Sequence, residues 1–468
     1  MSRKFQIKTV PSTWLENNGR RLDCGPYMSG ALEAKELLRK HNTEPLKRVT
    51  SDIYHAGRES RIWVDSPEHG IPFMGSTDIL SMDLTSLPLI SKKQVLSNPR
   101  FSITKGWTLI TRSGTVGRMA FARSDMDGVA CSEHVLRVVP NEDHIKPGYL
   151  YAYLSSRFGV PIVVSGTYGA IIQHIEPDHV CDLPVPRLGD IEEQAHDLIE
   201  KASELRVDAA KQIQDASTKY LTAAGISEIS SYDWILNSGR AGFTAKISRN
   251  ILRAVNYIPL NQELAETVKS SSPSWKPLGE LTIPGTLRRG LRFKRVDAEP
   301  EFGVRLVGQR EGFHLVPEGR FIAKSHLPND PLIYVPEGTI VIASQGGINE
   351  TDSFARAQFM YGKRLDYVYS EHFLRVIADE TKIPRGALFA FIRSNIAFRL
   401  LRACAVGSMQ QDFHPDLLAE IPVPIVSDDE AMAIDLLVRD SFQKYDDAID
   451  CEDQARTLVE RAIEEGGR

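Results

Sequence analysis

Hydrophobic and polar residues follow two different patterns along this chain, and the two patterns occur in a fixed order. Short runs rich in β-branched residues, such as Thr108–Thr111 and Val135–Val139, are bounded by Gly, Pro and Asn. Such runs predict short β-strands. An apolar helix is predicted after the strands, at Gly148–Ser156 and again at Gly386–Ser394. The pattern therefore predicts an α+β protein in which strands precede helices.

Two long, alanine-rich and charged segments carry a different rhythm, with apolar residues at alternating steps of three and four. That spacing is typical of the seam of a coiled coil. In the first segment the seam contains Ile191, Ala195, Leu198, Ala202, Leu205, Ala209 and Ala216, with a break at Gln212. In the second it contains Ile434, Leu437, Ala448, Cys451, Ala455, Leu458 and Ala462, with breaks at Ser441 and Lys444, beside a stripe of Phe442, Tyr445, Ile449, Val459 and Ile463.

Each long helix can bury its stripe only against a partner, and the other long helix is the obvious one. We expect the two to form an antiparallel coiled coil; the alternative is two helices that pack separately in bundles. A helix of about 33 residues is about 50 Å long at about 1.5 Å per residue. Such a rod would hold two folded units at a set separation.

The chain also repeats itself. The segment Cys131–Val139 reappears as Tyr369–Ile377, and between residues 131–188 and 369–426 we count 19 identical positions in 58. Weaker matches continue upstream, with an offset that grows from about 232 to 238 residues, so copy two carries about six extra residues between the segments that match Ile110 and Ser132. Insertions of this kind belong to loops. One scaffold used twice is the simplest explanation.

Composition narrows the class of protein. The 468 residues are 42% hydrophobic and 25% charged, which is ordinary for a globular chain of two or three domains. The N-terminus is polar, and no run of apolar residues is long enough to span a bilayer. Five scattered cysteines without a Cys-x-x-Cys motif favour reduced thiols in a cytoplasmic protein. The net charge of −5 does not by itself indicate a nucleic-acid binder.

Enzyme motifs are missing from the sequence. There is no phosphate-binding loop, no Pro-Pro dipeptide of the kind found in the target-base loop of amino-methyltransferases, no His-Glu-x-x-His and no Gly-x-Ser-x-Gly. The repeated Ser-Glu-His resembles part of a hydrolase triad, but consecutive residues on a strand diverge. We expect it to open a strand, with His134 on the face of Leu136 and Glu133 on the opposite face, in a structural role. We predict no catalytic residue and no metal site.

Local charge is more informative than net charge. Five cations lie within eight positions of copy two: Arg288, Arg289, Arg292, Lys294 and Arg295. The matching segment of copy one carries Arg58 and Arg61. A Gly-rich loop of copy one offers Arg112, Ser113, Thr115 and Arg118, and its counterpart in copy two offers Gln345 and Asn349. Charge runs are often only solvated surface, but polar loops at the same place in both copies favour DNA, with arginine on phosphate and amides on bases.

In the order of its parts, the chain resembles the specificity (S) subunits of type I restriction–modification systems. The likeness rests on Asp182–Pro186, on Glu193-Gln194 opening the long helix, on the Gly166–Gln173 segment and on the Ser113–Gly117 loop. Copy two departs from the pattern, with Asp429–Met432 in place of Glu-Gln and two glycines in the loop. The Gly166–Gln173 segment adds Tyr168 and Gln173 to the candidate DNA contacts, and its counterpart in copy two adds Gln410 and Gln411.

The resemblance implies a non-catalytic reader of a split, asymmetric DNA sequence. It implies target-recognition domains at 1–189 and 226–427 and spacer helices at 190–225 and 428–465. It further implies partners: double-stranded DNA, two adenine methyltransferase subunits that bring S-adenosylmethionine, and in some systems a restriction subunit. A stand-alone two-domain nuclease and a duplicated protein-interaction scaffold without DNA binding are the alternatives.

Overall fold

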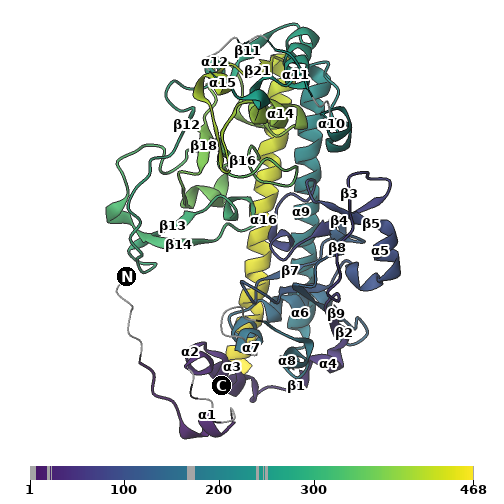
Figure 1. Cartoon of the computed structure of the whole chain (residues 1–468). Coiled ribbons are helices and arrows are strands. Elements are labelled where there is room, and N and C mark those ends of the chain that lie inside the picture. Colours follow the sequence, from purple (N-terminus) through teal and green to yellow (C-terminus); the bar gives the residue numbers. More distant parts are fainter. Residues whose placement is uncertain are drawn as a thin grey trace. The chain divides into compact units, whose positions relative to one another are not determined.

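The computed structural model describes residues 7–17, 20, 22, 24–165, 174–238, 242–245, 247 and 251–466 (Figure 1). The chain divides into two compact units. Unit 1 consists of Met1–Leu80, Leu87–Val207 and Asp447–Arg468, and unit 2 consists of Ser81–Ser86 and Asp208–Asp446. Each long helix is thus divided between the two units. The predicted domain limits instead treated each long helix as a separate spacer, and those limits stay a prediction.

Unit 1 begins with small helices and ends on a long one. Its helices are α1 (Ser12–Asn17), α2 (Gly25–Met28), α3 (Ala31–Leu38), α4 (Leu46–Val49), α5 (Lys92–Ser97), α6 (Pro147–Leu154), α7 (Gly159–Ser165), α8 (Pro177–Val180) and the first part of α9 (Asp190–Ala223). Its strands are β1 (Thr43–Pro45), β2 (Thr50–Tyr54), β3 (Trp63–Val64), β4 (Gly70–Met74), β5 (Leu89–Ser91), β6 (Thr108–Thr111), β7 (Met119–Phe121), β8 (Ala130–Cys131), β9 (Val135–Pro140) and β10 (Pro184–Pro186).

Unit 2 repeats this order of elements. Its helices are α10 (Ser231–Ser238), α11 (Pro259–Ser271), α12 (Leu278–Leu281), α13 (Arg385–Ile392), α14 (Asn395–Ala403), α15 (Pro415–Ala419) and the first part of α16 (Asp428–Gly466). Its strands are β11 (Trp275–Pro277), β12 (Arg288–Arg289), β13 (Gly303–Val307), β14 (Gly319–Ala323), β15 (Ile340–Ala343), β16 (Ala357–Phe359), β17 (Val368–Tyr369), β18 (Phe373–Val376), β19 (Ala405–Gly407), β20 (Gln411–Phe413) and β21 (Pro422–Pro424).

The two units share most of their sheet topology. Unit 1 has sheets of order β2-β9-β6-β7 and β3-β5-β4-β8, and unit 2 has sheets of order β12-β18-β15-β16 and β14-β13-β17, so the second sheet has one more strand in unit 1. Even the register agrees, because Leu109 pairs with Arg137 as Val341 pairs with Arg375. Each Pro-x-Pro segment forms a short strand, β10 on β1 and β21 on β11. The predicted fold class is confirmed: two α/β units of one build, with two long helices.

The predicted insertion lies in one loop. The connection from β6 to β7 spans residues 112–118, and the equivalent connection from β15 to β16 spans residues 344–356, which is six residues longer. The scaffold strands on either side keep their pairing. Copy two therefore differs from copy one at a loop and not within the sheet.

The long helices pair antiparallel, as predicted. In unit 1 the cluster Ala202, Ala448 and Cys451 and the ion pair between Arg206 and Glu452 join α9 to α16. In unit 2 Ser441 Oγ donates to Gln212 Oε1 at 3.3 Å. Contacts from early α9 to late α16, and from late α9 to early α16, define opposite directions. In Figure 1 the two helices are drawn in teal and yellow.

The seam differs from the predicted one by one residue at every second position. The buried positions of α9 include Ala195, Ile199, Ala202, Arg206, Ala209, Ile213, Ala216 and Tyr220. Leu198 and Leu205 of the predicted seam are only partly buried, and Ile213 is buried where the prediction placed a break at Gln212. In α16 the buried positions include Ile434, Ala448, Cys451 and Ala455 of the predicted seam and Phe442, Tyr445, Val459 and Ile463 of the neighbouring stripe. Val438, Ser441 and Glu452 are also buried and belonged to neither. The spacing was right, and the phase was wrong at every second position of α9.

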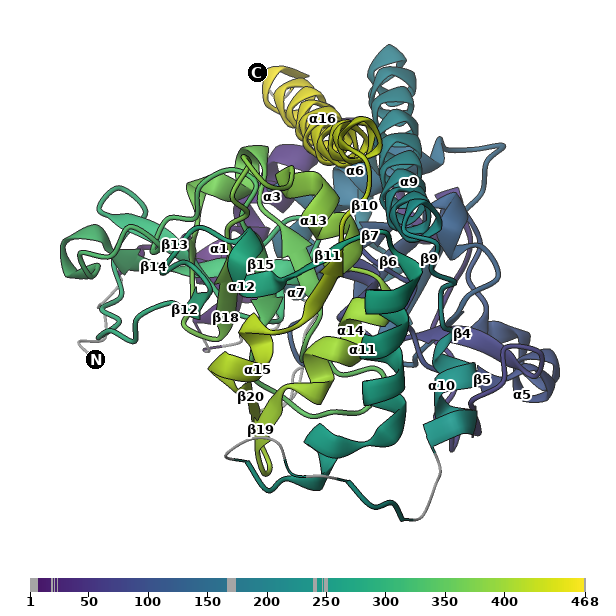
Figure 2. The same cartoon turned by 90° about the horizontal axis from the view of Figure 1, so that it is seen from above.

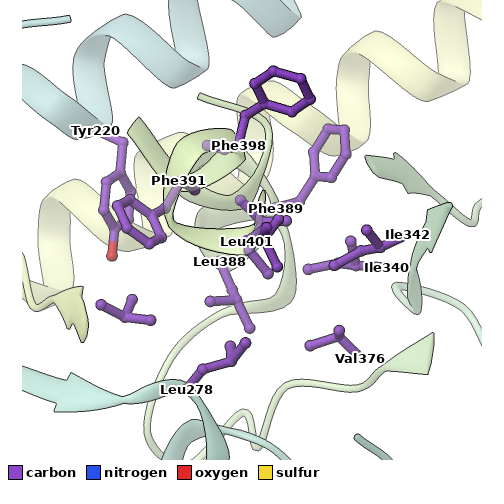
Figure 3. Close-up of a cluster of buried hydrophobic side chains, with 14 of the residues drawn as sticks. Tyr220, Leu278, Ile340, Ile342, Val376, Leu388, Phe389, Phe391, Phe398 and Leu401 are labelled. Carbon is purple, nitrogen blue, oxygen red and sulfur yellow. The ribbon is translucent and has the colours of Figure 1, made fainter. Parts of the chain in front are cut away.

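Each unit has an apolar core in which a short helix is buried on all sides. All eight residues of α6 are buried, which explains why it is apolar all round. Tyr149 of α6 donates a hydrogen bond to the carbonyl of Pro186. Copy two has Ala387 there, and Tyr220 from α9 donates to the equivalent carbonyl of Pro424 at 2.6 Å. Figure 3 shows Tyr220 beside Phe391 of α13 in the core of unit 2. No helix in the described part of the chain is long and apolar enough to cross a membrane.

Candidate nucleic-acid interface

A fully buried arginine holds the Ser-Glu-His segment in both units. Arg137 donates to the carbonyls of Ser132 and Val135 at 2.8 and 2.7 Å, and also to that of Cys131. Arg375 makes the equivalent bonds to the carbonyls of Ser370, Phe373 and Tyr369 at 3.0, 2.6 and 2.7 Å. A buried guanidinium needs acceptors for its donors, and here backbone carbonyls accept from both terminal nitrogens of each arginine. The Nε atom of each has no partner among the described residues.

The Ser-Glu-His segment is a turn and not the start of a strand. It connects β8 to β9 in unit 1 and β17 to β18 in unit 2. The predicted alternation of Glu133 and His134 across a strand is therefore wrong, because the arginine beneath the turn draws the backbone carbonyls inward. The turn is held by these hydrogen bonds and forms an edge on which other side chains are fixed; its structural role stays a prediction.

One such side chain is an arginine that pairs with the turn's glutamate. Arg61 pairs with Glu133 in unit 1, and Arg295 pairs with Glu371 in unit 2. Burial raises the pKa of the Glu133 carboxyl, but hydrogen bonds from its own backbone N–H and from the Arg61 guanidinium lower it by more. The net shift of the pKa is therefore downward. Glu371 behaves in the same way with Arg295. Both carboxylates are thus held charged, and both arginines are fixed in place with about a quarter of the side chain exposed, 27% for Arg61 and 29% for Arg295.

This ion pair corrects the alignment of the two basic segments. If Arg61 is equivalent to Arg295, then Arg58 is equivalent to Arg292, whereas pairing Gly57 with Gly290 would place Arg58 opposite Leu291. Both Arg58 and Arg292 are exposed. A free arginine three residues before a fixed one is therefore common to the two units.

The histidine of the turn is not part of a repeated triad. Ser113 Oγ lies 2.7 Å from His134 Nδ1, and burial followed by the nearby Arg61 and Arg112 lowers the pKa of His134. In unit 2 a glutamine, Gln345, corresponds to Ser113, and His372 Nδ1 is buried without a hydrogen-bond partner among the described residues. The contact between a hydroxyl and the histidine is therefore not repeated in unit 2.

The basic segment of unit 2 is partly neutralised. Arg288 pairs with the buried Asp330 at 2.7 Å, and Arg289 pairs with Asp412 at 2.8 Å. A side-chain hydrogen bond from Arg288 lowers the pKa of Asp330. Arg292 and Lys294 are exposed, and neither forms an ion pair within the described residues. These two cations of the segment have no carboxylate partner within the described residues.

The Gly-rich loop of unit 1 presents fewer groups than predicted. Arg112 is 3% exposed; it donates to the carbonyl of Ile175 at 3.0 Å and pairs with Glu176. Since its guanidinium is engaged inside the unit, Arg112 fixes the loop and does not face a ligand. Thr115 is exposed, whereas Ser113 and Arg118 are half-buried. Tyr168 and Gln173 lie outside the described residues.

The longer loop of unit 2 is braced by side chains that the sequence did not single out. Arg402 donates to the carbonyls of Ile348 and Asn349 at 2.6 and 2.9 Å. Gln309 Nε2 donates to the carbonyl of Gln345 at 2.6 Å. These bonds leave Asn349 exposed and Gln345 half-buried on a fixed backbone. Nothing in the pattern of Arg402, in an amphipathic helix, distinguishes it from an ordinary surface cation.

Contacts join this loop to the β19–β20 hairpin and to the basic segment. The backbone N–H of Gln411 donates to the carbonyl of Gly346 at 3.0 Å, and the next residue, Asp412, holds Arg289. Gln411 itself is 4% exposed, so of the two predicted glutamines only Gln410 is offered to solvent. Unit 2 therefore brings three predicted segments into one connected surface: the basic segment, the loop and the hairpin.

No cluster of three or more His, Cys, Asp or Glu side chains that could hold a metal ion occurs in the described part of the chain. All five cysteines are free thiols. What the surface offers is cations, amides and hydroxyls on braced loops. Such groups are suited to phosphates and base edges.

No protein-family model matches this sequence, and no curated protein matches it. Among solved structures, the chain is similar to the S subunit of the type I restriction–modification system of M. genitalium, with a TM-score of 0.34, 13% identity, and coverage of 91% of this chain and 95% of that one. It is also similar to the HsdS subunit of Thermoanaerobacter tengcongensis, with a TM-score of 0.27, 13% identity and coverage of 91% and 96%. A third similar chain comes from a structure that describes complex assembly and conformational transition of the type I R-M system. Its TM-score is 0.26 and its identity 14%, with coverage of 91% of this chain and 97% of that one.

Proposed function

We propose that this chain is the non-catalytic DNA sequence-recognition subunit of a type I restriction–modification or related methylation complex. Each unit would read one half of a bipartite, asymmetric target. The chain would act in the cytoplasm, together with adenine methyltransferase subunits that supply both the catalytic site and S-adenosylmethionine.

One observation carries the proposal: the two units share a scaffold down to single hydrogen bonds, yet differ in the loops which that scaffold holds. Arg137 and Arg375 bind equivalent carbonyls, and Arg61 and Arg295 pair with equivalent glutamates. The loop between the third and fourth strands of the main sheet, in contrast, is six residues longer in unit 2 and offers Gln345 and Asn349 where unit 1 offers Ser113 and Thr115. Two different readers on one frame are what a target with two unlike halves requires.

The available groups divide into two kinds. Arg58, Arg292 and Lys294 are exposed cations suited to phosphate contacts, which set affinity and its salt dependence. Thr115 in unit 1, and Gln345, Asn349 and Gln410 in unit 2, are hydroxyl and amide groups suited to base edges. Arg61, Arg289 and Arg295 keep part of their side chain exposed beside their carboxylate partners and can add to phosphate binding.

The paired helices α9 and α16 would have two tasks. At about 1.5 Å per residue, the 34 residues of α9 extend over about 50 Å, which would set the gap between the two half-sites. Their outer faces would bind two methyltransferase subunits and, in a restricting complex, a restriction subunit. A rigid pair suits this role because both helices bury a continuous stripe.

Selection from a random duplex library tests the proposal. The purified chain is mixed with its methyltransferase partner, and bound duplexes are sequenced. We expect a motif of two short blocks separated by a gap of fixed length, and no enrichment for the chain mixed with an unrelated protein. DNA cleavage by the chain alone with a divalent metal would favour the nuclease alternative, and no enrichment with any partner would favour the interaction scaffold.

A further inference from the structure

The β19–β20 hairpin of unit 2 ends in an apolar side chain. Met409 lies between β19 and β20 and is 92% exposed, more than the other large hydrophobic residues of the described chain. Its neighbours Ser408 and Gln410 are exposed as well. Figure 2 shows the hairpin projecting from unit 2 past α15. Single exposed apolar residues are common on proteins, so the position of this one needs further argument.

The base of the hairpin is rigid. Asn256 Nδ2 donates to the carbonyls of Ala403 and Ala405 at 2.6 and 3.0 Å. Phe413 stacks on Phe354, with ring centroids 4.7 Å apart and planes at 23°. Within the turn, Gln411 Nε2 donates to the carbonyl of Ser408 at 2.5 Å. A tip that is held from both strands loses little conformational freedom when it binds.

The tip also lies next to the groups proposed to bind DNA. Gln411, two residues after Met409, is bonded to Gly346 of the recognition loop, and Asp412 holds Arg289 of the basic segment. Arg289 is followed closely by the unpaired Arg292 and Lys294. An apolar point beside a positive strip matches the surface of a DNA groove, where phosphates border the apolar parts of the bases.

The sequence of copy one supports the same reading. By the offset of 238 residues, Met409 corresponds to Ile171 and Gln411 to Gln173. Ile171 lies outside the described residues, so only its identity counts here. A large apolar residue two positions before a shared glutamine is thus present in both copies, within segments that otherwise differ.

We infer that Met409 contacts bases directly in the half-site read by unit 2, and so helps to determine its sequence. This inference rests on the proposed function. Methionine is flexible and polarisable, and it can press against a thymine methyl group or enter a base step. In either case the contact is apolar, and it contributes to specificity without neutralising a phosphate.

The test compares variants of the full chain in complex with the methyltransferase, on a duplex that the wild-type complex selects. Met409→Gln keeps length and removes the apolar character, whereas Met409→Leu keeps the apolar character. We expect Met409→Gln to weaken binding to the selected duplex about tenfold, with non-specific binding and the salt slope unchanged, and Met409→Leu to stay close to wild type. Phe302→Ala is the control, because Phe302 is a 69% exposed residue beside β13, outside the three segments of the surface.

Modified duplexes distinguish the two kinds of apolar contact. Replacing a thymine by uracil should reproduce the loss if the methyl group is the partner, and 2-aminopurine should brighten on binding if the side chain enters a base step. Specific affinity of Met409→Gln within roughly twofold of wild type would overturn the inference and leave the proposed function standing. An equal loss on all DNA with a reduced salt slope would also overturn it. If the wild-type complex selects no duplex, the inference and the proposed function fail together.

Discussion

The buried ion pair between the long helices gives the sharpest stability prediction. Glu452 of α16 is 5% exposed; it pairs with Arg206 of α9, accepts a hydrogen bond from the Tyr151 hydroxyl, and bonds Arg456 at 2.7 Å. Replacing Glu452 by Gln leaves Arg206 buried without a charged partner. Removing one member of a buried ion pair costs about 3–5 kcal/mol, so we expect the free energy of unfolding to fall by that amount.

The same ion pair makes the stability of the protein depend on pH. Burial raises the pKa of Glu452, but Arg206 and Arg456 outweigh it and lower the value from 4.5 to about 2. A carboxylate with a depressed pKa stabilises the fold above its unfolded pKa, and this stabilisation is lost as the pH falls from about 4.5 towards about 2. A shift of that size corresponds to roughly 3 kcal/mol.

Urea denaturation followed by circular dichroism measures both effects, at neutral pH and through the acid range. Asp453→Asn is the matched control, because Asp453 follows Glu452 on α16 and its side chain is 59% exposed. This substitution should change the free energy of unfolding by less than about 0.5 kcal/mol. The pair Arg206→Met with Glu452→Leu should recover most of the loss, because apolar residues can replace a buried ion pair. If Glu452→Gln costs less than about 1 kcal/mol, or keeps the acid dependence of the wild type, the ion pair does not stabilise the helix pair as argued.

Three further predictions concern the recognition units. Arg292→Ala should weaken binding to all DNA and reduce the salt slope by about one, measured by fluorescence anisotropy from low to high salt, whereas the buried Arg112→Ala should lower stability and leave the slope unchanged. Arg375→Met removes three hydrogen bonds at about 1 kcal/mol each, so the free energy of unfolding of unit 2 should fall by roughly 3 kcal/mol. The amide hydrogens of the Tyr369–Val376 segment should then exchange faster, and unchanged exchange would contradict the scaffold role. Inserting seven residues at matched positions of α9 and α16 keeps the seam in phase and adds about 10 Å, so the gap in the selected motif should grow by about three base pairs; an unchanged gap would reject the spacer role.

The sequence allowed the architecture to be predicted because the architecture is repeated and periodic. Strands β6 and β9 and both long helices lie where the hydrophobic pattern placed them, and the insertion lies in a loop. The phase of the helix seam could not be predicted, because it depends on burying Arg206 and Tyr220, and charged residues are usually exposed. The place of Ser81–Ser86 in unit 2 was missed as well, since only the folded chain shows Met82 buried in that core.

The candidate surface could be predicted only in outline. A run of cations is visible in a sequence, but its carboxylate partners are distant, so Arg292 and Lys294 could not be separated from Arg288 and Arg295. Burial of Arg112 depends on carbonyls some sixty residues away. The supports of the loops, Arg402 and Gln309, act through backbone carbonyls and leave no pattern at all.

The central claim is that each unit reads its own half of a split sequence, and changing one unit alone tests it most directly. Asn349 and Gln345 belong to unit 2, so the variant Asn349→Ala with Gln345→Ala should alter the motif that the complex selects in one block only. Sequencing the selected duplexes would show the other block and the gap unchanged. Altered preference in both blocks, or in neither, would contradict the account.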